Sequence, residues 1–148
     1  MAFILSASPV LTPALSDVSK LLSEMAAALT RPLESGANED FRFLSAAGSC
    51  QIYAPWRLFS LRPGSLITQV GFQNGDGISR INACRGRTPD DFVAAVAATR
   101  HAPQIRIDIM RRGFPMRLVA DRHAVTWAQL PNEFANDAGG DCSVERAK

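Results

Sequence analysis

The stretch covering residues 62–82, RPGSLITQVGFQNGDGISRIN, decides how this chain folds. The opening RPGS is a turn sequence that places Ser65 to accept a backbone N–H at a helix start. Residues 66–70 supply about one and a half helical turns, and Gly71 suits the left-handed position that closes a helix. The polar turn at residues 74–76, NGD, then reverses the chain into a short strand. The stretch therefore predicts a one-turn helix, a tight turn and a buried strand in that order.

A longer helix is predicted to follow this stretch. Thr88-Pro89-Asp90-Asp91 matches a capping box, with Thr88 as N-cap, Pro89 at the first helical position and Asp91 reaching back. Apolar residues then recur at helical spacing, and the pattern predicts that the helix continues to His101. These apolar residues are Phe92, Val93, Val96 and Ala97.

A hairpin is predicted after the helix. Ile105, Ile107 and Ile109 alternate with polar or intermediate residues, which is the period of a half-buried strand. Arg112-Gly113 is a hairpin turn, and residues 114–119 form the returning strand. Strands are also predicted at residues 41–44 and 51–61.

These elements resemble a bacterial PDZ domain over residues 41–119. The segments RLFSLRPGS, GFQNGD and TPDDFVAAVAATRHAPQ are most similar to the C-terminal PDZ domain of general secretion pathway protein C, the inner-membrane clamp of the bacterial type II secretion machine. The resemblance implies an α+β fold. We expect a small, partly open β-barrel or sandwich of five or six strands with two helices, plus an N-terminal helix.

The chain divides into four parts on this interpretation. Residues 1–13 are a loose leader, and residues 14–40 hold an amphipathic helix and a polar loop. Residues 41–122 form the PDZ-like domain, and residues 123–148 are a largely mobile extension. The helix carries one apolar stripe made of Leu15, Val18, Leu22, Met25 and Leu29.

Composition narrows the function classes. The chain has 148 residues and a net charge of +2, which suits one domain and is too small a charge to indicate nucleic-acid binding. No apolar run approaches the roughly 20 residues that span a bilayer. The apolar start, MAFILSASPVLTP, lacks the positive region of a signal peptide. The resemblance nevertheless implies a periplasmic or envelope-associated protein.

The three cysteines, Cys50, Cys84 and Cys142, have no CxxC spacing, so neither a zinc site nor a complete disulfide set is indicated. A bridge between Cys50 and Cys84 in an oxidising compartment and ordinary free thiols both stay open. No residues form a catalytic triad or an HExxH motif. We therefore expect no enzyme activity, no cofactor, no metal and no small-molecule substrate.

The resemblance also implies where a partner binds. A PDZ domain takes up an extended peptide as an added strand beside its second strand, opposite the long helix. The predicted receiving strand spans residues 56–60. The predicted peptide-binding residues are Trp56, Arg57, Leu58 and Phe59 on the strand and Phe92 and Val96 on the helix.

Pro55 removes a backbone donor from the loop that would capture a terminal carboxylate, so an internal strand or a folded partner fits better than a free C-terminus. The predicted function is thus a non-catalytic interaction module of a type II secretion apparatus, with another secretion component as its partner. The alternative is a peptide-sensing regulator of a separate periplasmic protease. A third hypothesis is that the groove is filled by the chain's own tail or helix, which gives a homodimer or a self-blocked domain.

Overall fold

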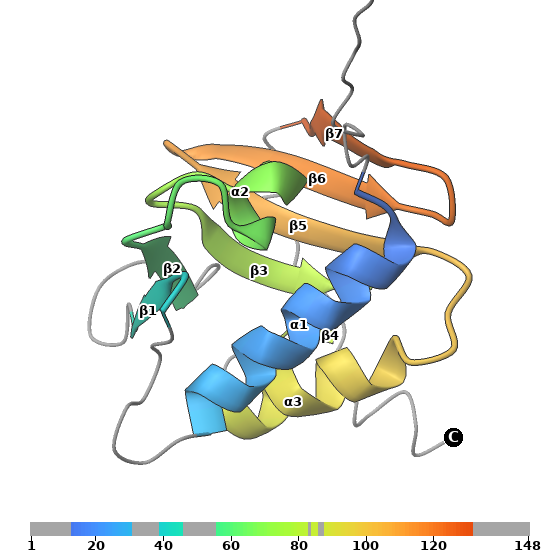
Figure 1. Ribbon diagram of the computed structural model, residues 1–148, viewed down its shortest axis with the longest axis horizontal. Helices are drawn as coiled ribbons and strands as arrows, with labels where there is room; N and C mark the ends of the chain where they lie inside the picture. The colour runs from blue at the N-terminus through green and yellow to red at the C-terminus, as the bar shows by residue number, and fades with distance from the viewer. Residues whose placement is uncertain (1–12, 31–38, 46–55, 83, 86–87, 132–148) are drawn as a thin grey trace, which may run out of the picture.

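Three helices lie against one antiparallel sheet of seven strands (Figure 1). This computed structural model describes residues 13–30, 39–45, 56–82, 84–85 and 88–131. The strand order is β1-β2-β3-β5-β6-β7, and β4 pairs with β3. The elements are α1 (Leu15–Thr30), β1 (Arg42–Ser45), β2 (Trp56–Phe59), α2 (Leu66–Val70), β3 (Gly77–Ile81), β4 (Cys84–Arg85), α3 (Pro89–Ala98), β5 (Ile105–Arg111), β6 (Phe114–Ala120) and β7 (Val125–Gln129).

The α+β class predicted from the sequence is confirmed, but the described residues form seven strands rather than five or six, and these make one sheet that does not close into a barrel. The two ends of the strand order, β1 and β7, do not pair with each other, so the sheet stays open. β7 pairs with β6 along its whole length, from Val125 opposite Ala120 to Gln129 opposite Met116. The sheet therefore continues past residue 122, where we expected the folded domain to end.

The core lies between the helices and one face of the sheet. Figure 1 shows α1 lying across this face, with α3 beside it. Ile105, Ile107 and Ile109 of β5 are fully buried on this side, as their alternation predicted. The apolar stripe of α1 packs toward these isoleucines. After Leu15, which is partly buried, all of its members are buried: Val18, Leu22, Met25 and Leu29.

The predicted end of α2 at Gly71 is confirmed, but the predicted side-chain cap at its start, Ser65, is wrong. Gly71 takes the left-handed conformation at φ 113°, and its N–H donates to the carbonyl of Thr68. The N–H of Phe72 donates to the carbonyl of Ile67, which completes the double closure of a helix end. Ser65 is not a side-chain cap, because its hydroxyl donates to the carbonyl of Arg62 at 2.6 Å instead.

The predicted start of α3 is confirmed at its hydroxyl cap. Thr88 Oγ1 accepts a hydrogen bond from the backbone N–H of Asp91 at 3.0 Å, and Pro89 occupies the first helical position. α3 ends at Ala98 rather than at His101. The hairpin turn lies at Arg112 and Gly113, whose φ angles of 54° and 84° fit a tight two-residue connection.

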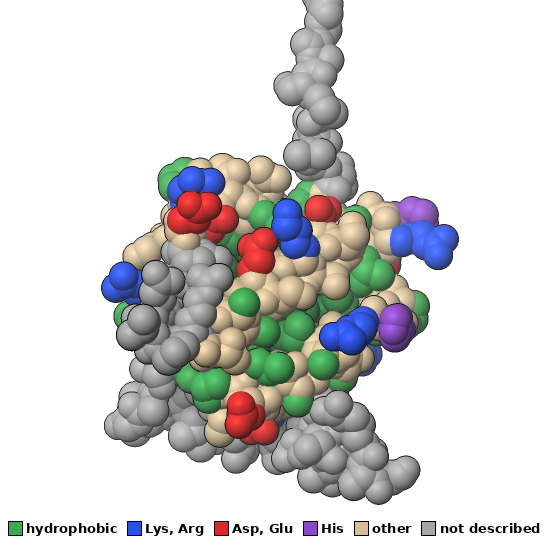
Figure 2. All heavy atoms as spheres, turned by 60° about the horizontal axis from the view of Figure 1, so that its bottom comes forward, with side chains coloured by type: hydrophobic (Ala, Val, Ile, Leu, Met, Phe, Trp, Pro, Cys, Tyr) green, Lys and Arg blue, Asp and Glu red, His purple; other side chains and the backbone are tan. Residues whose placement is uncertain are grey.

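The outer side of α3 exposes several small apolar residues, whereas most of the exposed residues of α1 are polar. Figure 2 shows apolar side chains gathered over α1 and α3, with charged side chains around the margin. The exposed residues of α3 include Val93, Ala97 and Ala98, and Ala27 is exposed on α1. None of the helices in the described ranges is both long and apolar enough to cross a bilayer.

Candidate protein-binding site

The strand predicted to receive a peptide already has a neighbour on each side. β2 pairs with β3 through Trp56 opposite Ile78 and Arg57 opposite Gly77. On its other side β2 pairs with β1, and the register runs from Arg42 opposite Phe59 to Ser45 opposite Trp56. The prediction that residues 56–60 form an open edge is therefore wrong.

The aromatic side chain of Phe43 on β1 fills the slot between β2 and α3. The ring of Phe43 lies 5.9 Å from the ring of Phe92 on α3 and 6.4 Å from Trp56 on β2, measured between ring centroids. Phe41 stacks edge-on against Phe43 at 5.5 Å, and both side chains are buried. Trp56 and Phe92, two of the residues that the sequence assigned to peptide binding, are thus brought together, but around a strand of the same chain.

Because Phe43 occupies this slot, only some of the predicted peptide-binding residues are accessible to a partner. Leu58 and Phe92 have no exposed surface and belong to the core, so they cannot touch a docked peptide. Val96 is partly buried and packs against the same core. Arg57 and Phe59, by contrast, are partly exposed, because alternate residues of a strand point to opposite faces.

The outer edge of β1 carries backbone groups that pair with none of the described strands. The N–H of Leu58 donates to the carbonyl of Asp76 at 2.8 Å, and its carbonyl accepts from the N–H of Gly75 at 2.6 Å, so the polar backbone of Leu58 faces away from β1. Phe43, opposite Leu58, is therefore in a non-hydrogen-bonded pair. It follows that the N–H and C=O of Phe43 point outward, where no described residue pairs with them.

The sheet face beside this edge combines cations and apolar groups. We call it the Arg-Leu face and define it by Arg42 and Leu44 on β1 and Arg57 and Phe59 on β2. Arg42 lies opposite Phe59, and Leu44 lies opposite Arg57. The guanidinium of Arg57 lies 5.7 Å from the ring centroid of Phe59, and Leu44 is 49% exposed. The four positions include no acid.

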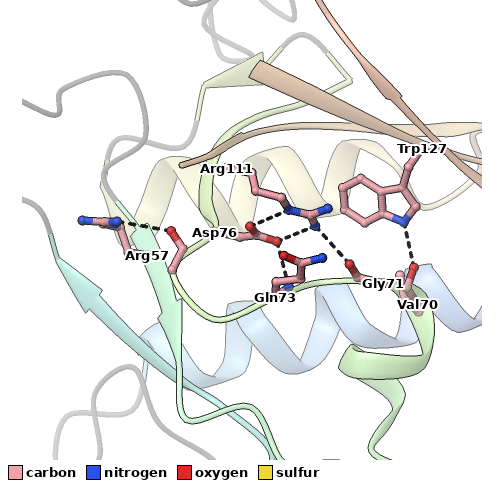
Figure 3. A network of polar contacts seen from close by, with 8 residues as sticks. Arg57, Val70, Gly71, Gln73, Asp76, Arg111 and Trp127 are labelled. Atoms are coloured by element: carbon pink, nitrogen blue, oxygen red, sulfur yellow. Dashed lines mark hydrogen bonds and ion pairs between the residues drawn. The ribbon is translucent and has the colours of Figure 1, made fainter. Parts of the chain in front are cut away.

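An ion pair between a buried carboxylate and a partly exposed arginine holds the neighbouring NGD turn (Figure 3). Asp76 is 1% exposed and accepts hydrogen bonds from Arg111 Nε at 2.9 Å and Arg111 Nη2 at 2.8 Å. The backbone N–H of Gln73 also donates to Asp76 at 2.8 Å. A buried carboxylate with this many donors is fully compensated, so Asp76 has a structural role.

The same network reaches β7 through Trp127. Arg111 Nη2 donates to the carbonyl of Gly71 at 3.0 Å, and its guanidinium lies 4.7 Å from the Trp127 ring centroid. The indole N–H donates to the carbonyl of Val70 at 2.9 Å. Trp127 therefore fastens the end of α2 to the far edge of the sheet (Figure 3).

A second charged cluster lies on the sheet face opposite the helices. Asp108 lies between Arg80 and Arg117 in the strand register. Arg117 Nε donates to Asp108 at 2.7 Å, and Arg80 Nε lies 3.3 Å from the other carboxylate oxygen. The hydrogen bond to Asp108 raises the pKa of Arg117 above its ordinary value. The described ranges contain no group of three acidic, cysteine or histidine side chains placed to hold a metal ion.

Cys84 is buried and disulfide-bonded. The remaining cysteines of the chain, Cys50 and Cys142, are its only candidate partners within the chain and lie outside the described residues. The expectation that Cys84 could be an ordinary free thiol is therefore wrong.

The structure therefore places this chain in the class of α+β domains with an open antiparallel sheet. Neither family models, curated proteins nor solved structures match this chain.

Proposed function

We propose that this chain is a non-catalytic protein-interaction module of a bacterial type II secretion apparatus. Its partner, another secretion component, binds by adding an extended segment to the sheet. Because β1 fills the slot beside β2, the added strand lies on the outer side of β1. The resemblance of residues 57–76 and 88–104 to a secretion-clamp PDZ domain suggests the apparatus, and the edge geometry suggests how the partner binds.

The observation that carries this proposal is the outward-facing backbone of Phe43. An edge strand with unpaired N–H and C=O groups is a template for another strand. Natural sheets usually protect such edges with charges, prolines or bulges. Here β1 carries one exposed charge, Arg42, but Leu44, an apolar residue, stands half-exposed at the edge. Phe43 is anchored in the core, so the edge is held in an extended form.

The disulfide at Cys84 supports an oxidising compartment such as the periplasm. Disulfides persist in secreted and periplasmic proteins and are rare in the reducing cytosol. This agrees with the envelope location that the resemblance implies. Mass spectrometry of the protein isolated from cells, with free thiols alkylated before reduction, measures the state of Cys84 directly.

The test is a site-specific photo-crosslink from the folded domain in envelope extract. A photoreactive residue at position 44 is expected to capture a secretion component identified by mass spectrometry. The same residue at position 97, which is exposed on α3, is the matched control and is expected to capture none. If the folded domain captures no secretion component from either position, the proposal is wrong.

A further inference from the structure

We propose that the segment bound at β1 is an extended strand that alternates acidic and apolar residues. The acid lies opposite Arg42, and the apolar residue lies opposite Leu44. This inference rests on the proposed function, because it assumes strand addition, and it adds the chemistry of the partner. Two features carry it, the register that the backbone of Phe43 imposes and the charge of the Arg-Leu face.

The register follows from the direction of the backbone groups. A strand added antiparallel to β1 exchanges both hydrogen bonds with Phe43, whose N–H and C=O point outward. The two partner residues flanking that contact then lie opposite Arg42 and Leu44. Since directly opposed residues share a face of the sheet, both side chains project onto the Arg-Leu face.

The chemistry of the face selects these two side chains. Arg42 is exposed, and no described acid pairs with it; the nearby Asp40 is held by Arg62 at 3.0 Å. An acidic side chain opposite Arg42 gains a cross-strand ion pair, and an apolar one opposite Leu44 covers its exposed surface. A basic residue opposite Arg42 is instead repelled by the positive charges of Arg42 and Arg57.

A second copy of this chain is a poorer occupant. β1 spans Arg42–Ser45 and contains no acid. In a dimer formed by pairing two β1 edges, the second β1 strand contributes another Arg42 and no carboxylate to the Arg-Leu face, so the positive charge of the face is not neutralised. We accordingly assign the edge to a different protein, and a dimer becomes an outcome of the test.

The experiment measures binding of two labelled nine-residue peptides by fluorescence anisotropy. One peptide alternates Glu and Val with Thr spacers, and the other has Lys in place of every Glu. Both are acetylated and amidated, so that no free terminus contributes. The acidic peptide is expected to bind at least about tenfold more tightly than the basic peptide, and its affinity is expected to fall as salt is raised.

Three variants locate the site. Arg42→Glu is expected to weaken the acidic peptide about tenfold and to strengthen the basic one. Ser45→Pro removes an N–H that faces outward by alternation with Phe43, and it is expected to abolish binding of both peptides. Arg122→Glu makes the same charge change at an exposed turn and is expected to leave both affinities unchanged. Circular dichroism checks that each variant is folded, and the reversed preference of Arg42→Glu is a signal that unfolding cannot produce.

The outcomes are distinguishable from those of the proposed function. Equal binding of the two peptides, or an unchanged preference in Arg42→Glu, overturns the inference even if the crosslink at position 44 captures a secretion component. A dimer detected by light scattering and lost in Ser45→Pro also overturns it, because the edge then belongs to a second copy. Failure of the crosslink with the peptide preference intact overturns the secretion assignment alone.

Discussion

Gly71 shows how one residue can serve two constraints. Its φ of 113° is a conformation that residues with a side chain rarely adopt, and a Cβ built at this position lies 2.5 Å from Nε1 of Trp127. The indole cannot retreat without giving up its hydrogen bond to Val70. Glycine is therefore required both by the end of α2 and by the packing of β7.

Replacing Gly71 with alanine is expected to lower the free energy of unfolding by about 2–4 kcal/mol. The matched control is Gly113→Ala, at φ 84°, where a Cβ meets nothing within 4 Å. That control has the conformational cost alone, about 1 kcal/mol. Urea denaturation followed by tryptophan fluorescence measures both. Equal losses for the two variants would show that the contact with Trp127 adds nothing.

Asp121 links stability to pH. The backbone N–H groups of His123 and Ala124 donate to its Oδ1 at 2.8 and 3.0 Å, and they hold the pKa of Asp121 below its ordinary value. A carboxyl whose pKa is lowered by folding stabilises the protein above its unfolded-state pKa of about 3.9. That contribution disappears as pH falls through the lower, folded-state value.

The variant Asp121→Ala is therefore expected to show a flatter loss of stability than the parent below about pH 4. Thermal melts at a series of pH values measure this slope. Arg122→Gln, which changes a neighbouring exposed charge and keeps both hydrogen bonds, is expected to follow the parent. An Asp121→Ala profile parallel to that of the parent contradicts the assignment.

At the scale of elements, β1 is the strand that most changes the functional interpretation. Its alternation places Phe43 in the slot where the sequence predicted a foreign peptide, and the buried Phe41 just before the strand packs against Phe43. Burial of two aromatic side chains makes β1 a part of the core rather than a loosely held cover. A partner therefore meets the outer edge of β1.

The variant Phe43→Ala tests whether β1 is integral. Loss of a buried phenylalanine is expected to cost about 3–5 kcal/mol in the free energy of unfolding. Arg42→Ala, on the exposed side of the same strand, is expected to stay within about 0.5 kcal/mol of the parent. Chemical denaturation compares the two. A small effect of Phe43→Ala would indicate that β1 can be displaced, and that a partner peptide could then bind in the slot between β2 and α3.

At the scale of the whole molecule, β7 decides where the folded unit ends. The sheet runs from β1 to β7, and Trp127 connects its last strand to α2 and to the ion pair of Arg111 and Asp76. A single side chain from the last strand thus packs against residues more than 50 positions earlier, since Trp127 and Val70 are separated by 57 residues. The cooperative unit therefore includes β7.

A chain ending at residue 122 loses the pairing of β7 with β6 and the partly buried Trp127, and it is expected to lose at least about 3 kcal/mol of stability or to fail to fold. A chain ending at residue 131 keeps β7 and is the matched control. Circular dichroism melts of the two truncations give the comparison. Similar melting temperatures would show that the last strand is dispensable and that residue 122 is the true boundary.

The local elements followed from the sequence because their signals are local. Helical spacing located α1 and α3, strict alternation located β5, and punctuation residues such as Gly71 and Pro89 fixed where α2 ends and α3 begins. Ser65 is the exception, because its hydroxyl had two acceptable partners and sequence spacing does not choose between them.

Strand neighbours were decided only by the tertiary structure. Pairing joins residues far apart in the chain, and the alternation of β1 suits a foreign edge as well as β2. The side chains at positions 41, 43, 58 and 92 were all recognisable as apolar, but only their packing shows that they complete one core among themselves. The open sheet, the filled slot and the outward edge of β1 thus come from long-range burial, which a local pattern does not encode.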